Sequence, residues 1–347
     1  MGSFEETVKL LQKKFGKSYI NVASEVLDTD YQRNSMGLFA LDFICGGGLP
    51  ERKIMMLAGQ ESAGKTSTML SMIAYYQKMG KKCALLNKEF GFDAVWANKL
   101  GVQLDKLWMA RPQTIEEASD TIEPLIIAGE FDLIALDSIA GLSSDKELEE
   151  SAEVGGRSGN AKANGAMVRK ITSRLNDCAV KIKTSILLIN QIREKQNIRF
   201  GSPTYTPGGH ALHHACDIII WLRQNTASKA IGGKENPLGI GVNAYCSKNR
   251  TAPPFRTSIY NVMFDGHLDE RENLIELGIV NGVIEKMGYK YTFGDKSITD
   301  LKPFMKALTD EDYQNIKKQI LEKKEALNIT IKESDNKVLD SNLEGTV

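Results

Sequence analysis

Short apolar runs alternate with amphipathic segments between about residue 35 and residue 265. Six runs have the length and composition of buried strands, each bounded by Gly or polar residues: KIMMLAG, CALLNKE, KLWMAR, DLIALDS, SILLINQ and DIIIWLR. Helical spacing fills several gaps between them, as in KTSTMLSMIAYYQKMG and TIEEASDTIEPLIIAG. This alternation predicts an α/β fold with a mostly parallel, twisted sheet that binds ligands at the carboxyl ends of its strands. The later runs GVNAYCSKN and TSIYNVMF predict an antiparallel edge.

The two ends of the chain depart from this central pattern. In segment 1–34, FEETVKLLQKKFG predicts an amphipathic helix that packs either on its own core or on a neighbouring subunit. Its apolar stripe consists of Phe4, Val8, Leu11 and Phe15. After the core of 35–266, the pattern predicts helices around a small hairpin, forming a C-terminal α+β domain over 267–330. The polar residues 331–347 predict a disordered tail.

Composition narrows the class of protein. The chain has 347 residues, 42% of them hydrophobic, with a formal net charge of +0, so the whole-chain charge does not indicate a nucleic-acid partner. Its five cysteines form no C-x-x-C pair, which predicts buried free thiols in a reducing compartment. The N-terminus has no apolar signal core and no apolar run is long enough to span a membrane. We therefore expect a soluble cytoplasmic protein with no membrane partner.

Residues 59–67, GQESAGKTS, complete the pattern G-x-x-x-x-G-K-[ST] between a predicted strand and a predicted helix. In this motif the glycines let backbone N–H groups point at phosphates, and the helix N-terminus favours an anion. Lys65 is expected to reach the β- and γ-phosphates, and the Thr66 hydroxyl to bind Mg²⁺. The predicted nucleotide-contacting residues here are Gly59, Glu61, Ser62, Ala63, Gly64, Lys65, Thr66 and Ser67.

Polar residues end three of the predicted strands. Asp137 ends FDLIALDS, as expected of a carboxylate that holds Mg²⁺ through water, although it is also suited to cap a helix. Glu89 closes CALLNKE, where it would activate an attacking water or remain a solvated strand-end acid. Asn190 and Gln191 close a third strand, where an amide can sense a γ-phosphate.

Two Gly-rich segments, 143–165 and 193–209, lack a strand or helix pattern. Residues 157–174 carry cations and no acid, namely Arg157, Lys162, Arg169, Lys170 and Arg174. The second segment carries Arg193, Lys195, Arg199, Phe200 and Tyr205, then Gly208 and Gly209 before a helix that starts with His210. Such groups can bind phosphates and stack on bases, although basic loops are often simply solvated. The spacing of HALHH also permits a metal site, which no other ligand cluster supports.

Together these stretches resemble the RecA family of recombinases over about residues 5–325. Besides GQESAGKTS, the resemblance rests on KKFGKS, GLFALDFICGGGLP, LNKEFGFDAVWANKLGV, LIALDSIAGL, LLINQIREK, FGSPTYTPGGHAL, KNRTAPPF and LIELGIVNGVIEKMGYKYTF, in the family's order and spacing. After VMF the chain reads DGHLDERENLIELG, which looks more like phage-encoded relatives of the UvsX type than the Gly-Glu-Gly turn of bacterial members. Lys88 stands before Glu89, where a small residue is commoner.

The resemblance implies roles for single residues. Glu89 matches the catalytic glutamate and Gln191 the γ-phosphate sensor. Asp93 and Trp96 match the positions that contact adenine, with Trp96 replacing the usual Tyr. Lys248 and Arg250, in SKNRTAPPF, match two cations that enter the ATP site of the adjacent subunit and stabilise charge on the transferring phosphoryl group. Without the resemblance, these two cations would be assigned to a solvated turn.

The implied function is ATP-dependent strand exchange. A helical filament on single-stranded DNA would pair with homologous double-stranded DNA, with single-strand-binding and mediator proteins as helpers, in a bacterial cell or a phage-infected host. The two Gly-rich segments would line the filament axis and hold the strand. Two other classes share the core, a hexameric DNA helicase motor and a regulatory ATPase that ignores DNA. The match of the loops and the KNR sequence favour the recombinase.

Overall fold

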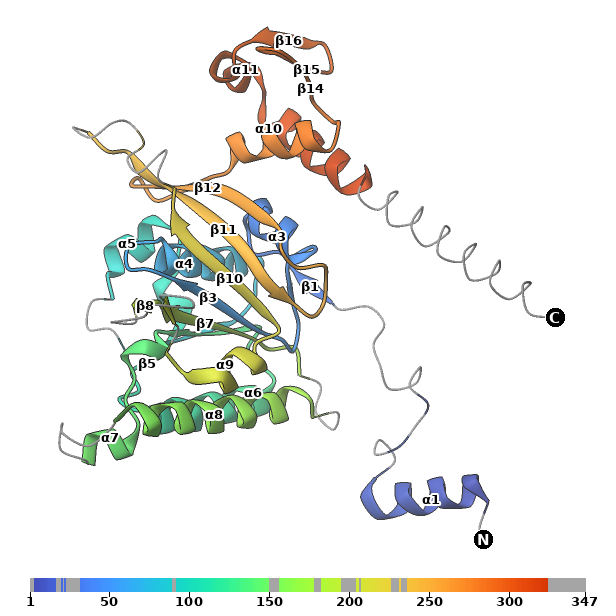
Figure 1. Ribbon diagram of the computed structural model, residues 1–347, viewed down its shortest axis with the longest axis vertical. Helices are drawn as coiled ribbons and strands as arrows, with labels where there is room; N and C mark the ends of the chain where they lie inside the picture. The colour runs from blue at the N-terminus through green and yellow to red at the C-terminus, as the bar shows by residue number, and fades with distance from the viewer. Residues whose placement is uncertain are drawn as a thin grey trace, which may run out of the picture.

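A nine-stranded sheet forms the centre of the computed structural model (Figure 1). Across the sheet the strands are β13 (Leu268–Asp269), β12 (Thr257–Met263), β11 (Gly239–Asn249), β10 (Ile218–Gln224), β3 (Ile54–Gly59), β7 (Ser185–Gln191), β6 (Leu133–Asp137), β4 (Cys83–Asn87) and β5 (Leu107–Ala110). The strands from β10 to β5 are parallel, and β11, β12 and β13 are added antiparallel. The predicted α/β sheet with an antiparallel edge is confirmed.

The structure describes residues 3–16, 20, 22, 32–88, 92–149, 156–177, 182–194, 204, 205, 207–225, 231 and 236–323. The predicted tail 331–347 lies outside these residues.

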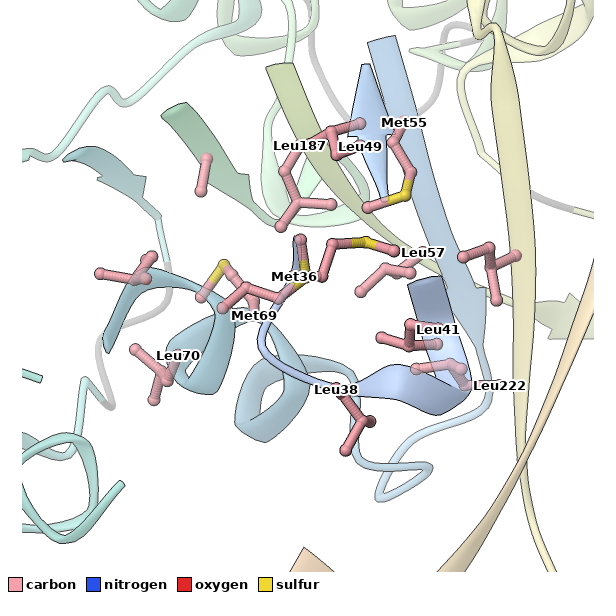
Figure 2. Packing of buried hydrophobic residues seen from close by; sticks show 14 of the residues in the cluster. Met36, Leu38, Leu41, Leu49, Met55, Leu57, Met69, Leu70, Leu187 and Leu222 are labelled. Carbon is pink, nitrogen blue, oxygen red and sulfur yellow. The ribbon is translucent and has the colours of Figure 1, made fainter. Parts of the chain in front are cut away.

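Helices cover both faces of the sheet, which is why its central strands are apolar on both sides. One face packs against α3 (Phe39–Cys45), α4 (Lys65–Lys78) and α5 (Ala94–Lys99), and Figure 2 shows Met36, Leu41, Met55, Leu57 and Met69 meeting in that cluster. The other face packs against α6 (Ile115–Ala128), α8 (Gly156–Leu175) and α9 (Gly209–Ala215). The four described cysteines, Cys45, Cys83, Cys216 and Cys246, are buried free thiols, as predicted.

Strand β5 corrects one prediction. KLWMAR was expected to be a buried strand, but Trp108 is 67% exposed and Met109 is 37% exposed. The reason is its position, because β5 ends the sheet and, among the described strands, pairs with β4 alone. Strand order is not visible in an apolar run, so the sequence could not distinguish an edge strand from a central one.

Helix α8 corrects a second prediction. Segment 143–165 was expected to lack helix, but α7 (Asp145–Glu149) occupies its first part and α8 begins at Gly156. Gly and Asn residues lower the intrinsic helix propensity of GRSGNAKANG. Packing overrides this low propensity. A Cβ on Gly165 would lie only 3.3 Å from the Cβ of Ala211 on α9, so glycine is needed where the two helices touch. Small residues let α8 and α9 approach closely.

The C-terminal elements lie beside the main sheet (Figure 1) and have an apolar cluster of their own. These elements are α10 (Arg271–Val280), strands β14 (Glu285–Met287), β15 (Lys290–Phe293) and β16 (Lys296–Thr299), α11 (Leu301–Ala307) and helical residues 310–323. The expected hairpin is therefore a three-stranded antiparallel sheet. Because β13 pairs with β12, the main sheet continues to Asp269, past the expected boundary at 266.

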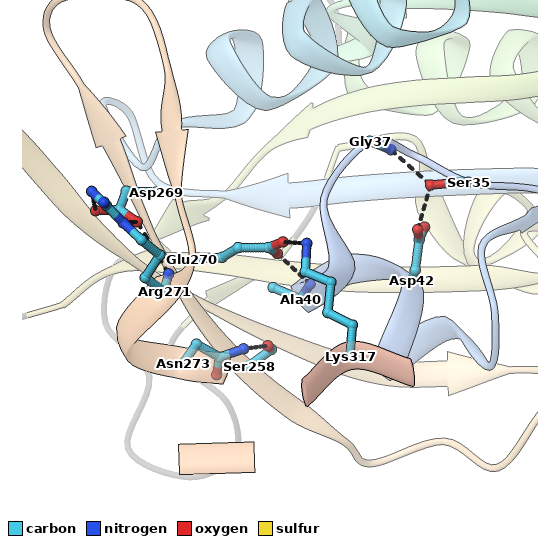
Figure 3. A network of polar contacts seen from close by, with 10 residues as sticks. All are labelled: Ser35, Gly37, Ala40, Asp42, Ser258, Asp269, Glu270, Arg271, Asn273 and Lys317. Carbon is cyan, nitrogen blue, oxygen red and sulfur yellow. Dashed lines mark hydrogen bonds and ion pairs between the residues drawn. The ribbon is translucent and has the colours of Figure 1, made fainter. Parts of the chain in front are cut away.

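A seam of polar contacts joins the C-terminal domain to the core (Figure 3). Glu270 accepts hydrogen bonds from the Ala40 backbone N–H at 2.8 Å and from Lys317 Nζ at 2.7 Å. Asp42, on the same helix as Ala40, accepts from the Ser35 hydroxyl at 2.5 Å and from the Met36 N–H at 2.8 Å. Burial raises the pKa of Asp42 to about 6 in spite of these donors.

The N-terminal segment holds α1 (Phe4–Phe15), capped by the Ser3 hydroxyl, and the short pair β1 (Arg33–Asn34) and β2 (Leu49–Pro50). The predicted helix is confirmed. None of its residues is buried, and Phe4 is 81% exposed. Its docking on a neighbour stays a prediction. Among the described residues, no helix combines the length and apolarity needed to cross a bilayer.

Candidate nucleotide and DNA site

The P-loop has the geometry that its glycines predict. Gly59 ends β3, and a Cβ there would lie 2.4 Å from the Leu222 carbonyl oxygen. Gly64 caps α4 with φ +84°, a conformation that favours glycine. From the neighbouring strand, Gln224 Nε2 donates to the Ser62 carbonyl at 3.2 Å. The loop is thus fixed where the parallel strands have their carboxyl ends, which we call the carboxyl edge of the sheet. It lies ahead of a helix N-terminus.

Lys65, Thr66 and Asp137 meet at this edge. The Thr66 hydroxyl donates to Asp137 Oδ2 at 2.8 Å, and Lys65 Nζ donates to the Gln60 carbonyl at 2.6 Å. Asp137 is 4% exposed at the end of β6. The paired hydroxyl and carboxylate oxygens are hard donors of the kind that Mg²⁺ prefers.

A cavity of about 140 Å³ adjoins this pair. Its lining combines predicted metal ligands with predicted adenine contacts: Thr66, Met69, Leu70, Leu85, Asn87, Phe92, Asp93, Trp96 and Asp137. Trp96 is held by its indole N–H, which donates to Ser67 Oγ at 3.1 Å, and Asp93 caps α5 by accepting from the Trp96 N–H at 2.9 Å. Sequence reasoning missed Asn87, although it ends β4 directly beside Asp137 in the sheet register.

The end of β7 lies against the P-loop. Gln191 pairs with Gly59 in the register of β3 and β7, so the predicted sensor stands beside the first residue of the motif. The Ile192 N–H donates to the Gly59 carbonyl at 3.1 Å. Glu89, the predicted catalytic acid, lies outside the described residues.

Lys248 and Arg250 lie at the opposite edge, where the parallel strands have their amino ends. Because β11 runs antiparallel to β10, Asn249 pairs with Ile218, which in turn pairs with Met55 at the start of β3. Lys248 Nζ donates to the carbonyls of His213 and His214 at 2.7 and 3.0 Å.

Arg250 shares this site at the end of α9. Its guanidinium donates to the His214 carbonyl at 2.7 Å and lies 3.7 Å from Asp217 Oδ1. Burial, and then the Arg250 charge, lower the pKa of Lys248. Two cations therefore cap the C-terminus of α9.

The residues predicted to contact DNA differ in their exposure and in whether they already form an ion pair. Arg169, on α8, is exposed. Arg174 Nε instead donates to Glu123 Oε1 at 2.7 Å, and Arg174 would have to leave this pair to reach DNA. Gly208 and Gly209 have φ of +99° and +72° at the start of α9, and His210 is exposed in its first turn.

The remaining predicted contacts are less fully described. Arg157 lies on α8 and Arg193 on the short strand β8 (Arg193–Glu194), which pairs with β9 (Thr204–Tyr205). Nothing further is described of these two side chains. Lys195, Arg199 and Phe200 lie outside the described residues.

The histidines of α9 form no metal cluster. The rings of His210 and His214 are 6.5 Å apart, and within the described ranges no three His, Cys, Asp or Glu side chains gather as metal ligands. Burial, and then the charge of Lys248, lower the pKa of His213.

Comparison with known proteins agrees with this geometry. A family model described as the RecA N-terminal domain matches residues 3–269. Protein RecA of Cereibacter sphaeroides is 32% identical over 311 residues, covering 88% of this chain and 89% of that protein. Protein RecA of Rickettsia prowazekii is 31% identical over 330 residues, covering 94% and 95% of the two chains. Protein RecA of Thermus thermophilus is 32% identical over 296 residues, covering 84% and 85%.

Proposed function

The chain belongs to the RecA family and is a DNA-dependent ATPase of homologous recombination, and we propose that each of its ATP sites is completed by a second copy of the chain. The observation that carries this proposal is the separation of the two halves of the site. The P-loop begins at the last residue of β3, whereas Lys248 and Arg250, beyond β10, are level with the first residues of β3. A six-residue strand separates these ends by roughly 16 Å, which is beyond the reach of an arginine side chain.

Within one subunit, the P-loop edge would bind the phosphates and the base. Lys65 would exchange the Gln60 carbonyl for the β- and γ-phosphates. Thr66 and Asp137 would hold Mg²⁺, whose charge offsets the charge on the phosphates. Trp96, oriented by Ser67, would stack on adenine beside Asp93, and Glu89 would activate the attacking water.

The neighbouring subunit would supply Lys248 and Arg250. Their positive charge would stabilise the transferring phosphoryl group, as arginine fingers do. An interface that joins one edge of a subunit to the opposite edge of the next is heterologous, and its repetition gives an open helical filament when the rotation between subunits does not close a ring. The unburied apolar stripe of α1 would dock on a neighbour in this filament.

DNA would bind along α8 and the segment between β7 and α9. Arg157 and Arg169 would contact phosphates from α8, together with Arg193, Lys195 and Arg199 from the second segment. Phe200 would stack on bases, and the N–H groups of Gly208 and Gly209 with His210 would bind a phosphate. Gln191 would link nucleotide to DNA, so that ATP favours a DNA-gripping state and hydrolysis releases it. Such a filament would act in the cytoplasm, with single-strand-binding and mediator proteins as further partners.

Mixing two inactive variants tests the divided site. Lys65→Ala removes the P-loop lysine but keeps the trans-acting cations, and a Lys248→Ala, Arg250→Ala double variant does the reverse. In a mixed filament about one interface in four combines the intact halves, so hydrolysis should reappear on mixing. Two inactive variants that stay inactive together, in filaments shown to contain both, would contradict the divided site.

Imaging separates the recombinase from the other classes. We expect single-stranded DNA to stimulate hydrolysis strongly and negative-stain micrographs to show open helical filaments. Closed rings would favour a helicase motor, and hydrolysis indifferent to DNA would favour a regulatory ATPase.

A further inference from the structure

The last two residues of β7 face opposite sides of the sheet. Side chains alternate along a strand, with Leu187 and Ile189 in the cluster on the α4 face and Ile186 and Leu188 in the cluster on the α8 face. By this alternation Gln191 is on the nucleotide face. Asn190 is on the face covered by α8 and α9, where its Nδ2 lies 3.7 Å from Met56 Sδ.

Asn190 joins β7 to the segment that returns after the predicted DNA loop. Its side chain is fully buried, and its Nδ2 donates to the Pro207 carbonyl oxygen at 2.8 Å. A carbonyl only accepts hydrogen bonds, so the amide nitrogen must point at Pro207. The bond spans 17 positions of sequence and meets the chain just before α9.

Pro207 is firmly connected to the core through α9. Gly208 follows it with φ +99°, and a Cβ on Gly208 would lie 2.5 Å from Leu212 Cδ2. Leu212 is itself fully buried in the cluster on this face. A displacement of the Pro207 carbonyl is therefore also a displacement of the α9 N-terminus.

The other polar atom of Asn190 is unpaired among the described residues. Its Oδ1 is buried and accepts no hydrogen bond from any of them. A buried unpaired acceptor costs on the order of 1–3 kcal/mol, a cost that leucine at this position would avoid. The amide is therefore poorly explained by stability alone, and its one strong interaction is the bond to Pro207.

Both ends of the segment between β7 and α9 are thus held near the P-loop. At the outgoing end, the Ile192 N–H donates to the Gly59 carbonyl. Above this point Arg193 pairs with Tyr205 and Glu194 with Thr204 in the short ribbon of β8 and β9. Asn190 adds the link to the returning end.

We propose that Asn190 is a positioning residue that makes the two ends of the DNA-binding segment move together when Gln191 responds to the nucleotide. The proposal rests on the proposed function, in which Gln191 senses the γ-phosphate. Because the two side chains belong to consecutive residues of one strand, a shift of the backbone at Gln191 also moves Asn190. The bond to Pro207 carries that shift to the α9 N-terminus, where Gly208 and Gly209 would bind a DNA phosphate.

The test is the nucleotide dependence of DNA affinity in Asn190→Leu. Fluorescence anisotropy with a labelled single strand gives the Kd in ADP and in a slowly hydrolysed ATP analogue. One hydrogen bond is worth about 0.5–1.5 kcal/mol, so the ratio of the two Kd values should fall by about two- to twelvefold. Nucleotide affinity without DNA should stay within about twofold of the parent chain, because Asn190 does not face the nucleotide.

Asn273→Leu is a control at a buried asparagine outside the DNA-binding segments. Asn273 is 5% exposed; its Nδ2 donates to the Ser258 hydroxyl at 2.9 Å, and its Oδ1 accepts from the Ile259 N–H at 3.2 Å. These bonds join α10 to β12, so this variant should lower the unfolding midpoint at least as much and keep the Kd ratio. Asn190→Asp should recover the ratio as pH falls, because only the protonated carboxyl can donate to Pro207.

The outcomes separate this inference from the function on which it rests. A normal Kd ratio in Asn190→Leu, or an equal loss in Asn273→Leu, would overturn the role of Asn190. If the unchanged protein bound DNA equally in both nucleotides, the proposed switch itself would be wrong.

Discussion

The two edges of the parallel sheet are built by different rules. At the carboxyl edge, the P-loop, Asp137 and Gln191 each end or follow a parallel strand, so they gather there regardless of their separation in sequence. At the opposite edge, Lys248 and Arg250 arrive at the end of β11, a strand of reversed direction. A reversed strand thus places the two proposed half-sites of one chain at opposite ends of the parallel strands.

The largest effect is expected from a substitution in the P-loop, at the carboxyl edge. Lys65→Ala should lower DNA-stimulated ATP hydrolysis by at least about a hundredfold and abolish strand exchange, because the phosphates lose their principal cation. Steady-state hydrolysis and a joint-molecule assay measure this. Lys78→Ala, an exposed lysine at the other end of α4, should behave as the parent chain. Normal exchange by Lys65→Ala would refute the nucleotide site.

The next largest effect is expected from a substitution at the opposite edge, where Arg250 lies. Arg250→Ala should lower kcat by about a hundredfold or more, as loss of an arginine finger does, yet leave nucleotide binding by dilute single subunits unchanged. Kinetics on DNA and equilibrium binding without DNA separate the two quantities. Arg223→Ala, an exposed arginine on β10, is the control. Equal loss of nucleotide binding in dilute Arg250→Ala would place Arg250 in its own subunit's site.

The carboxyl edge was predictable from sequence because its signals are local. A P-loop lies between a strand and a helix within a dozen residues, and Asp137 ends an apolar run. The capping of α9 by Lys248 and Arg250 is not local, since it depends on the antiparallel register of β11. Their role in a neighbouring site came from the resemblance to a family, and no periodicity in the chain indicates it.

Two misassigned segments show where local patterns fail. The glycines of α8 suggest a loop, but Gly165 allows close packing against Ala211 of α9 and Gly159 against Ser144. The apolar run of β5 suggests a central strand, but its place in the sheet exposes Trp108. Asn190 and Pro207 are invisible for the same reason, because their contact closes a segment whose path the sequence does not specify.

A moderate effect is expected at the base-binding part of the carboxyl edge. Trp96→Ala should raise the KM for ATP by about tenfold and leave kcat within about twofold, because stacking on adenine is equal in the ground and transition states. Steady-state kinetics on saturating DNA gives both constants. Trp96→Tyr, which restores a stacking ring, should return KM close to the parent value. A fall in kcat instead would mean that Trp96 positions the phosphates.

The smallest effect on activity is expected at the seam with the C-terminal domain, where all the polar partners belong to one chain. Burial first, and then the nearby Glu270, raise the pKa of Asp42 from 3.8 to about 6, against the hydrogen bonds from Ser35 and Met36 and the charge of Lys317. The native state therefore holds more protons than the unfolded chain between pH 4 and 6. Stability falls as pH rises through this window, by on the order of 2–3 kcal/mol at neutral pH.

Asp42→Asn should remove this loss of stability with rising pH. Its urea midpoint should be higher than that of the parent chain at pH 7 and equal to it at pH 4, and its rate of ATP hydrolysis should be unchanged. Asp312→Asn is the control of opposite sign. The Lys296 ammonium and the Thr309 N–H hold the pKa of Asp312 at about 2, so its stabilisation is present at neutral pH and is lost as pH falls towards 2. Asp312→Asn should therefore lower the midpoint at pH 7. If Asp42→Asn also lowered it, the ionised carboxylate would be the better partner for Ser35 and Met36, and the seam would depend on its charge.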